Sequence, residues 1–159
     1  MDKVKILFIC LGNICRSPAA NAIMQKMIDD GRLADRFFVD SAGIGGWHVG
    51  ELPDKRMRKH GAARGYRIDH VARQFDASAD FAAFDYIVVM DDENYKNVSR
   101  QARNAAEREK IVRMADLFAR HRGCDCVPDP YYDGDEGFEL ALDLIEDGCQ
   151  VLLARLAGQ

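Results

Sequence analysis

A cysteine and an arginine stand close together in a short loop near the start of the chain. The loop reads Cys10-Leu11-Gly12-Asn13-Ile14-Cys15-Arg16-Ser17, the pattern C-x5-R-S. It follows a run of apolar residues and leads into a segment with helical spacing. A short loop that closes onto a helix N-terminus directs several backbone N–H groups into one concavity, where the helix dipole adds positive potential. The loop is therefore predicted to bind a dianion such as a phosphate group.

The residue types in this loop suit nucleophilic chemistry on a bound phosphate. Arg16 offers a planar fork for two phosphate oxygens. Helix N-termini and guanidinium groups stabilise thiolates, so Cys10 is predicted to be the nucleophile, and Ser17 is placed to donate a hydrogen bond to its sulfur. Gly12 and Asn13 permit the unusual backbone angles of a tight cradle. Taken alone, Cys10 is also typical of the end of a core strand, but its combination with the loop favours the site.

An acidic residue far along the chain is the candidate proton donor. When a phosphate ester is cleaved, a carboxylic acid can protonate the leaving oxygen and later accept a proton from the attacking water. Asp129 lies in the segment Asp129-Pro130-Tyr131-Tyr132-Asp133, where prolines on both sides restrict the backbone and two tyrosines offer aromatic faces. Read by itself, the same segment is equally typical of an ordinary loop.

Four apolar runs predict strands, and four segments with helical spacing predict helices between them. The strands are expected at residues 4–9, 37–39, 86–90 and 111–114, and the helices at residues 18–31, 54–64, 92–105 and 137–156. Alternation of strands and helices without a repeat is typical of an α/β fold. We expect a three-layer sandwich, a central four-stranded parallel sheet flanked by helices, with the phosphate-binding loop after the first strand, since ligands of such sheets sit beyond the carboxyl ends of the strands.

Local signals set the ends of two expected helices. Ser17 is the expected N-cap of the first helix, and Pro18 occupies its first position, a place that proline favours. Gly148 interrupts the last helical pattern, so a kink is expected there.

The composition predicts one globular domain over residues 1–159. Hydrophobic residues make up 48% of the chain and there are only four prolines, which indicates neither disorder nor a linker. A net charge of −4 argues against nucleic acid as a partner. Basic residues do gather in the second expected helix, where a solvated face is favoured over a surface that attracts anions; they are Lys55, Arg56, Arg58, Lys59 and Arg64.

The chain is expected to be cytoplasmic, with free thiols and no metal. No apolar run approaches the ~18 residues of a membrane span, and the N-terminus has the pattern of a buried strand rather than of a signal peptide. The cysteines at 10, 15, 124, 126 and 149 are odd in number, which disfavours a disulfide framework, and their spacing fits zinc sites poorly.

Motifs along nearly the whole chain resemble those of the low-molecular-weight protein tyrosine phosphatases. They are F-I-C-L-G-N-I-C-R-S-P at 8–18, D-S-A-G at 40–43, Trp47 and Gly50 in the following loop, K-H-G at 59–61, H-V-A-R-Q-F at 70–75, F-D-Y-I-V-V-M-D at 84–91, and D-P-Y-Y at 129–132. The resemblance implies hydrolysis of phosphotyrosine through a cysteinyl-phosphate intermediate. In that chemistry Cys10 is the nucleophile, Arg16 binds the phosphate and stabilises the transition state, and Asp129 is the general acid and base.

The resemblance also implies supporting roles. Asn13, Ser17, Ser41 and His70 resemble a polar network that holds the loop in shape, with Asn13 bonded to Ser41 and His70. The residues similar to the family's crevice lining are Leu11, Ile14, Trp47, His48, Tyr131 and Tyr132. Gly12 and Cys15 complete the phosphate loop. The expected partners are phosphotyrosine proteins, without a cofactor; phosphate-like oxyanions should inhibit, and the chain should be a monomer or a weak homodimer.

Three other functions share parts of this pattern. A thiol-dependent arsenate reductase has the same kind of loop but uses two further cysteines, for which only Cys124 and Cys126 would be available. A phosphotyrosine-binding module would have lost Cys10 or Asp129, and a phosphotransfer subunit would lack Arg16 and the distant acid.

The second cysteine of the loop suggests redox control. A reactive thiolate is readily oxidised to sulfenic acid, which a neighbouring thiol can trap as a disulfide. Members of the family that this chain resembles protect themselves in this way, which predicts that Cys15 traps oxidised Cys10; simple packing of Cys15 under the loop is the alternative.

Overall fold

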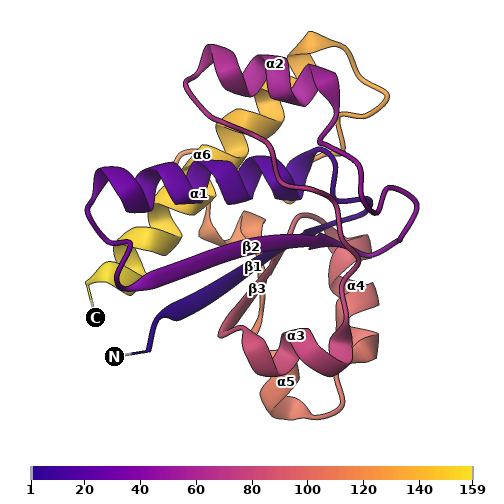
Figure 1. Ribbon diagram of the computed structural model, residues 1–159, viewed down its shortest axis with the longest axis vertical. Helices are drawn as coiled ribbons and strands as arrows, with labels where there is room; N and C mark the ends of the chain where they lie inside the picture. Colours follow the sequence, from indigo (N-terminus) through magenta and orange to yellow (C-terminus); the bar gives the residue numbers. More distant parts are fainter. Residues whose placement is uncertain (1, 159) are drawn as a thin grey trace.

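A parallel β-sheet forms the centre of the computed structural model, which describes residues 2–158 (Figure 1). The four strands are β1 (Val4–Cys10), β2 (Phe37–Gly43), β3 (Tyr86–Val89) and β4 (Ile111–Arg113). They are arranged in the order β2-β1-β3-β4, and every neighbouring pair is parallel. The predicted four-stranded sheet is confirmed, with β2 extending further than expected.

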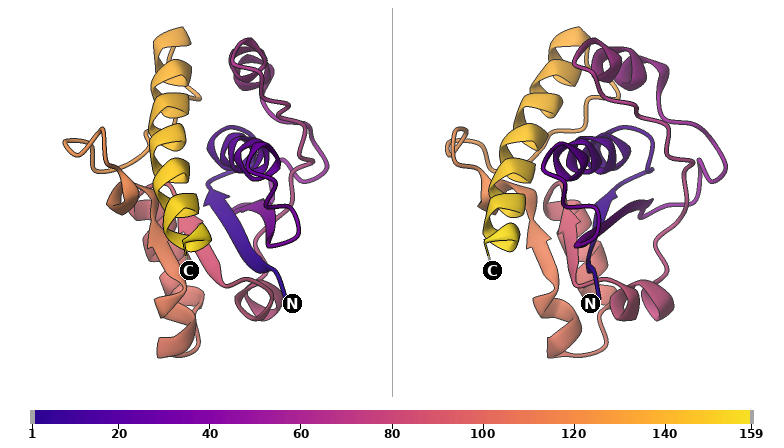
Figure 2. Two further views of the ribbon diagram at one scale, coloured as in Figure 1. Left: turned by 90° about the vertical axis from the view of Figure 1, so that its left-hand side faces the viewer. Right: turned by 60° about the vertical axis from the view of Figure 1, so that its left-hand side comes forward.

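Helices cover both faces of the sheet. They are α1 (Arg16–Asp30), α2 (Lys55–Ala63), α3 (Ala77–Ala83), α4 (Asp92–Gln101), α5 (Ala105–Glu109) and α6 (Asp135–Ala157), with a 3-10 turn η1 (Met114–Leu117). In Figure 1, α1 and α6 lie above the sheet and α3 to α5 below it, and the turned views of Figure 2 show the same two layers. This arrangement is the predicted three-layer sandwich.

Alternate residues of β1 supply the two cores. Ile6 and Phe8 are fully buried on the face that carries α1 and α6, whereas Leu7 and Ile9 are fully buried on the face with Phe81 of α3. Successive side chains of a strand point to opposite faces, so a strand between two helical layers must be apolar throughout. This requirement explains the continuous apolar run from which β1 was predicted.

The helices differ from the predicted ones at several points, and the last helix begins at Asp135, two residues earlier than expected. α1 begins at Arg16, two residues before Pro18, and its N-cap is Cys15, without a side-chain capping bond, so the prediction of Ser17 as N-cap is wrong. The helix expected over 92–105 ends at Gln101, and a separate short helix, α5, begins at Ala105. The short helix α3 was not predicted; Asp76 caps it by accepting a hydrogen bond of 3.0 Å from the Ser78 amide.

The last helix runs through Gly148 without interruption, contrary to the expected kink. A Cβ atom at this position would lie 2.2 Å from the Met114 sulfur, so the glycine allows η1 to pack closely on α6. Between residues 2 and 158, no helix is both long and apolar enough to span a lipid bilayer.

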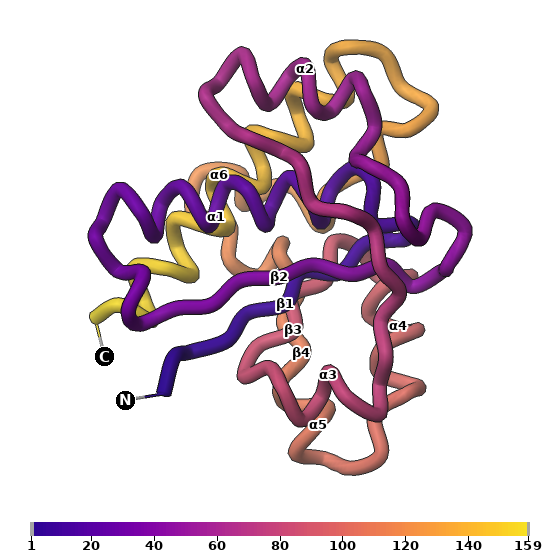
Figure 3. The backbone as a smooth tube through the Cα atoms, viewed as in Figure 1, coloured from indigo at the N-terminus to yellow at the C-terminus, as the bar shows by residue number. Residues whose placement is uncertain are grey.

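Three loops converge at the carboxyl edge of the sheet. The loop after β1, the loop after β2 and the segment between η1 and α6 meet there, and the last of these runs up beside α2 (Figure 3). The carboxyl ends of β1 and β2 are aligned, with Cys10 paired to Gly43. The fold therefore brings residues from both halves of the sequence to one place.

Candidate active site

The loop after β1 turns its backbone carbonyls outward. The carbonyls of Cys10 and Leu11 accept hydrogen bonds of 3.0 and 2.9 Å from the amides of Ile44 and Gly45, and the Ile14 carbonyl accepts one of 2.8 Å from the Asp54 amide. In a trans peptide, the next N–H points away from the carbonyl. The amides that follow these carbonyls therefore face the concave side of the loop, which is the arrangement of an anion cradle.

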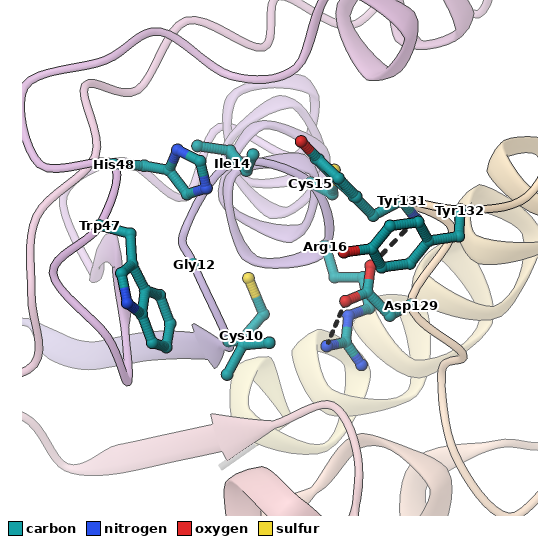
Figure 4. A pocket seen from close by; sticks show the side chains of 11 residues that line it. Cys10, Gly12, Ile14, Cys15, Arg16, Trp47, His48, Asp129, Tyr131 and Tyr132 are labelled. Atoms are coloured by element: carbon teal, nitrogen blue, oxygen red, sulfur yellow. Dashed lines mark hydrogen bonds and ion pairs between the residues drawn. The ribbon is translucent and has the colours of Figure 1, made fainter.

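The Cys10 sulfur sits at the end of β1 and points into the space above the loop (Figure 4). It lies 3.0 Å from the Ser17 hydroxyl oxygen, which also accepts a hydrogen bond of 2.7 Å from the Asn13 side-chain amide. Because the Asn13 amide occupies an acceptor position of the hydroxyl, the Ser17 proton points elsewhere, and it has two acceptors in reach: the Cys10 sulfur at 3.0 Å and the Ala42 carbonyl at 3.4 Å. Ser17 thus serves the thiol rather than the helix end.

Arg16 is almost fully buried and is held by one side of its guanidinium group. Its Nη1 donates to the Asp91 carboxylate at 2.6 Å and to the Val127 carbonyl at 2.8 Å, and its Nη2 lies 3.7 Å from the Asp129 carboxylate. Its Nε is buried and has no hydrogen-bond partner among residues 2–158. Burial opposes the charge, but Cys10, Asp91 and Asp129 outweigh it and raise the pKa of Arg16. The guanidinium is therefore a fixed cation beside the sulfur, with a free donor.

Asn13 holds the loop in its conformation. Its φ of 58° lies in the left-handed region, which asparagine tolerates better than most residues. Its side-chain amide donates to Ser17 and, at 3.0 Å, to the Ser41 hydroxyl, while its side-chain carbonyl accepts a hydrogen bond of 3.0 Å from the Arg73 amide. The expected bond to Ser41 is present. The place expected for His70 is taken by the backbone of Arg73.

His70 instead lies against Asp40 and the Ser41 backbone. Its Nδ1 is 3.5 Å from the Asp40 carboxylate, and its Nε2 is buried without a partner among the described residues. Burial lowers the pKa of His70 although Asp40 opposes this shift. Arg73 bridges Asp40 and Asp80 with its guanidinium group, so its own amide is firmly placed beneath Asn13.

Substitution of Asn13 should separate the two tasks of this side chain. Asn13→Gly keeps the left-handed backbone but loses the three hydrogen bonds, and we expect roughly a tenfold loss of phosphate affinity, since each bond contributes about 1 kcal/mol and the open loop recovers part of this from water. Asn13→Ala should lose about tenfold more, because the left-handed conformation costs an alanine about 1–2 kcal/mol. Competitive inhibition by inorganic phosphate measures both. Equal affinities for the alanine and glycine variants would show that φ at residue 13 is not constrained.

The sulfur opens into a cavity of about 190 Å³. All six predicted crevice residues line it, together with the loop and the predicted acid. Trp47 is 69% exposed and stands on one side, over Gly45, where a Cβ atom would lie 2.0 Å from the indole ring. Tyr131 and Tyr132 stand on the other side (Figure 4). An aromatic ring that enters between these walls would bring an attached group to Cys10.

Asp129 lies at the wall opposite Trp47, with its side chain 38% exposed. Its Oδ1 accepts a hydrogen bond of 3.1 Å from the Tyr131 amide, and its Oδ2 faces Arg16. The preceding segment is tied to the sheet, because the Val127 amide donates to the Met90 carbonyl at 2.8 Å. The structure thus brings Asp129 to Cys10 and Arg16, although it lies more than a hundred residues after them in the sequence.

Three residues at the site were not predicted to belong to it, and one of them, Arg56, was expected on a solvated face. Asp91 lies two residues after the buried end of strand β3, next to β1 in the sheet, and that position could have indicated its contact with Arg16. Asp54 and Arg56 join the second helix to the site: Asp54 accepts from the Arg56 guanidinium at 2.9 and 3.1 Å, and the Arg56 guanidinium lies 5.4 Å from the centre of the Tyr131 ring. No local pattern in the sequence indicates this last contact.

Comparison with known proteins gives matches over nearly the whole chain. A family model described as low molecular weight phosphotyrosine protein phosphatase matches residues 5–159. A protein of Synechocystis sp. that carries the name low molecular weight protein-tyrosine-phosphatase provisionally is 46% identical over 156 residues, 98% of each chain. A protein tyrosine phosphatase of Entamoeba histolytica, crystallised with Hepes in the active site, is similar in structure, with a TM-score of 0.94, 42% identity and 98% of each chain covered.

A further structural neighbour carries a different substrate in its name. It is described as a Drosophila arginine phosphatase and aligns with a TM-score of 0.88 at 32% identity, covering 96% of this chain and 98% of the neighbour.

Proposed function

The chain belongs to the low molecular weight phosphotyrosine protein phosphatase family, and on that premise we propose that it hydrolyses phosphotyrosine through a cysteinyl-phosphate intermediate on Cys10. The observation that carries the proposal is the buried Nε of Arg16, a charged donor to which no group in the described part of the chain bonds, beside the cavity that the Cys10 thiol lines. Buried donors are normally satisfied. A phosphate oxygen is the group that would satisfy this one.

In the first step the Cys10 thiolate attacks phosphorus. Nε and Nη2 of Arg16 bind two of the non-bridging phosphate oxygens. The inward-facing amides of the loop donate hydrogen bonds to the phosphate oxygens and stabilise their negative charge. A sulfur–phosphorus bond forms while the bond from phosphorus to the phenolic oxygen breaks. Asp129 donates its proton to that oxygen, so the tyrosine leaves in its neutral form.

In the second step water replaces the cysteine. The Asp129 carboxylate accepts a proton from water, whose oxygen attacks phosphorus and releases inorganic phosphate. The sulfur leaves as a thiolate, and the hydrogen bond from Ser17 at 3.0 Å stabilises the charge that returns to it. Both protein groups then have their initial charge, so the cycle is balanced.

The walls of the cavity favour an aromatic ester. Trp47 and Tyr131 present flat apolar faces on opposite sides, between which a phenyl ring buries its surface on both sides. A panel of peptides that carry phosphotyrosine, phosphoserine or phosphoarginine tests this preference, and the name of the Drosophila neighbour justifies the last of them. Highest kcat/KM on phosphotyrosine supports the proposal; faster turnover of phosphoserine or phosphoarginine contradicts it.

Replacement of Asp129 should affect substrates according to their leaving groups. Asp129→Asn removes the proton donor, so we expect kcat on phosphotyrosine peptides to fall about 100-fold or more. An aryl phosphate with a strongly acidic phenol needs little protonation in the transition state, and its kcat should fall by less than about tenfold. A plot of kcat against leaving-group acidity for wild type and variant measures the difference. Equal losses across the series would remove Asp129 from this role.

The arsenate reductase alternative is less well supported by the later cysteines. Cys124 and Cys126 lie in the segment before Asp129 and are both free thiols. Burial, followed by the charges of Asp125 and Asp91, raises the pKa of the Cys126 thiol. A thiol that attacks an oxidised partner needs the opposite shift. Arsenate with a thiol reductant belongs in the same assay panel to test this directly.

The redox role of Cys15 is also part of the proposal. Cys15 is buried under the loop, and burial, with Asp54 and Cys10 next, raises the pKa of its thiol well above the ordinary value. In the resting enzyme Cys15 therefore does not compete with Cys10 as a nucleophile. The raised pKa also disfavours attack by the Cys15 thiol on oxidised Cys10, as it does for Cys126, so the proposed role rests on the place of Cys15 in the same loop, five residues after Cys10.

A further inference from the structure

A second cavity adjoins the phosphate cavity. It measures about 400 Å³ and shares three wall residues with its neighbour, Ile14, His48 and Tyr131. Its far side is the beginning of α2, with Leu52, Lys55 and Arg58. The two cavities therefore adjoin along these three side chains. When one group of a ligand is bound over Cys10, an adjacent part of the same ligand can enter the second cavity.

The carboxylates around the second cavity are already paired. Asp54 accepts hydrogen bonds from the amide and the guanidinium of Arg56, and Glu51 lies 2.9 Å from Nδ1 of His48. Lys55 and Arg58 have no carboxylate partner in the described part of the chain. The Arg58 side chain donates a hydrogen bond from Nε to the Pro53 carbonyl, at 3.0 Å, which fixes the guanidinium at the cavity wall. Two cations thus remain available there.

The basic cluster expected to be a solvated face is divided by the structure. Arg64 is engaged by Glu139, Asp143 and Glu146 of α6, and Arg56 is engaged by Asp54. Lys55 and Arg58 stand instead in the first turn of α2, which contains no acidic residue. Positive side chains are unfavourable beside the positive end of a helix dipole. Local rules of this kind are broken most often where a residue serves a function.

We infer that this second cavity is a subsite for an acidic side chain that flanks the phosphotyrosine of a polypeptide substrate, with Lys55 and Arg58 as its cationic wall. The inference rests on the proposed function and names the substrates that it prefers. Successive residues of an extended peptide are about 3.3 Å apart, so a near neighbour of the phosphotyrosine reaches past His48 and Tyr131. Leu52 and the Tyr131 ring cover the methylene groups of a glutamate while its carboxylate meets the two cations.

The preference is tested first by comparing kcat/KM of the wild-type enzyme on two matched sets of peptides. One set of phosphotyrosine peptides carries a single glutamate moved through the positions on either side of the phosphotyrosine, and its partner set carries glutamine there. We expect kcat/KM to be about tenfold higher with glutamate at one or two adjacent positions, the ratio that one partly desolvated ion pair supplies. The ratio should shrink as salt is raised.

Charge reversal at the wall tests the assignment. In Lys55→Glu/Arg58→Glu the ratio of glutamate to glutamine peptides should fall from about ten to one or below. A ratio cancels any general change in activity, and acidic residues suit the first helical turn, so the variant should fold. Lys59→Glu is the matched control, because Lys59 is exposed on the same helix but lines neither cavity. It should keep the wild-type ratio.

Three results would overturn the inference. The first is a wild-type ratio of glutamate to glutamine peptides near one at every position, and the second is an unchanged ratio in the double variant. The third is a fall of this ratio in the Lys59 variant as large as in the double variant, which would indicate a general electrostatic attraction and no defined site. Failure of the wild-type enzyme to hydrolyse any phosphotyrosine peptide or aryl phosphate would instead overturn the proposed function, and this inference with it.

Discussion

Cys10→Ser is expected to lower turnover of phosphotyrosine by about 10⁴-fold or more while phosphate and vanadate still bind. The hydroxyl of serine is too weak an acid to be ionised by the charge of Arg16, so the nucleophile is lost. The cradle survives, because its shape depends on Asn13, Ser17 and the outward-bonded carbonyls rather than on the sulfur. Turnover of an aryl phosphate and calorimetric titration with vanadate measure the two effects separately.

The control for this prediction is the other cysteine of the loop. Cys15→Ser should retain turnover within about tenfold of wild type, because the buried Cys15 thiol does not take part in the resting cycle. Mass spectrometry of acid-quenched enzyme should find phosphate on Cys10 in wild type and in Cys15→Ser. Turnover near the wild-type rate in Cys10→Ser, or phosphate on another residue, would reject the covalent mechanism.

Much of the fold was predictable because helices bury both faces of the central sheet. A strand that is buried on both faces has to be apolar at every buried position, and β1 from Ile6 onward and β3 satisfy this requirement. α3 was missed because it is short and is defined by the Asp76 cap rather than by an apolar stripe. The split between α4 and α5 was missed for a similar reason: Asn104 caps a new helix by accepting from the Glu107 amide at 2.8 Å.

The chemical core of the site was predictable where residues are local, and less so where they meet through the fold. Cys10, Arg16 and Ser17 share one loop, so their spacing alone indicates their proximity. The anchor of Arg16 comes from Asp91, which lies 75 residues away. The identity of the group beneath Asn13 depends on how residues 70–75 cross the end of β2, which sequence spacing cannot fix. The amide of Arg73 was therefore missed and His70 was expected in its place.

Arg16→Lys is expected to reduce kcat/KM on phosphotyrosine by about 10³-fold although the charge at the site is kept. In the native site one guanidinium does two jobs: Nη1 is committed to Asp91 and Val127, while Nε and Nη2 remain for the phosphate. A lysine ammonium has a single nitrogen, which cannot reach the Asp91 carboxylate and two phosphate oxygens together. Because the nearer, fixed partner is Asp91, we expect the ammonium to be held there and withdrawn from the substrate.

This explanation predicts how a second substitution should act. Asp91→Asn in the wild-type background weakens the anchor but leaves the fork intact, so we expect a milder loss, about tenfold in kcat/KM. In Arg16→Lys, the added Asp91→Asn frees the ammonium from its carboxylate, so part of the lost activity should return and the two effects should not add. Kinetics of the four proteins on one aryl phosphate form a complete double-mutant cycle. If the losses are additive, Asp91 does not hold the clamp, and the weakness of lysine at position 16 has to be assigned to the geometry of phosphate binding alone.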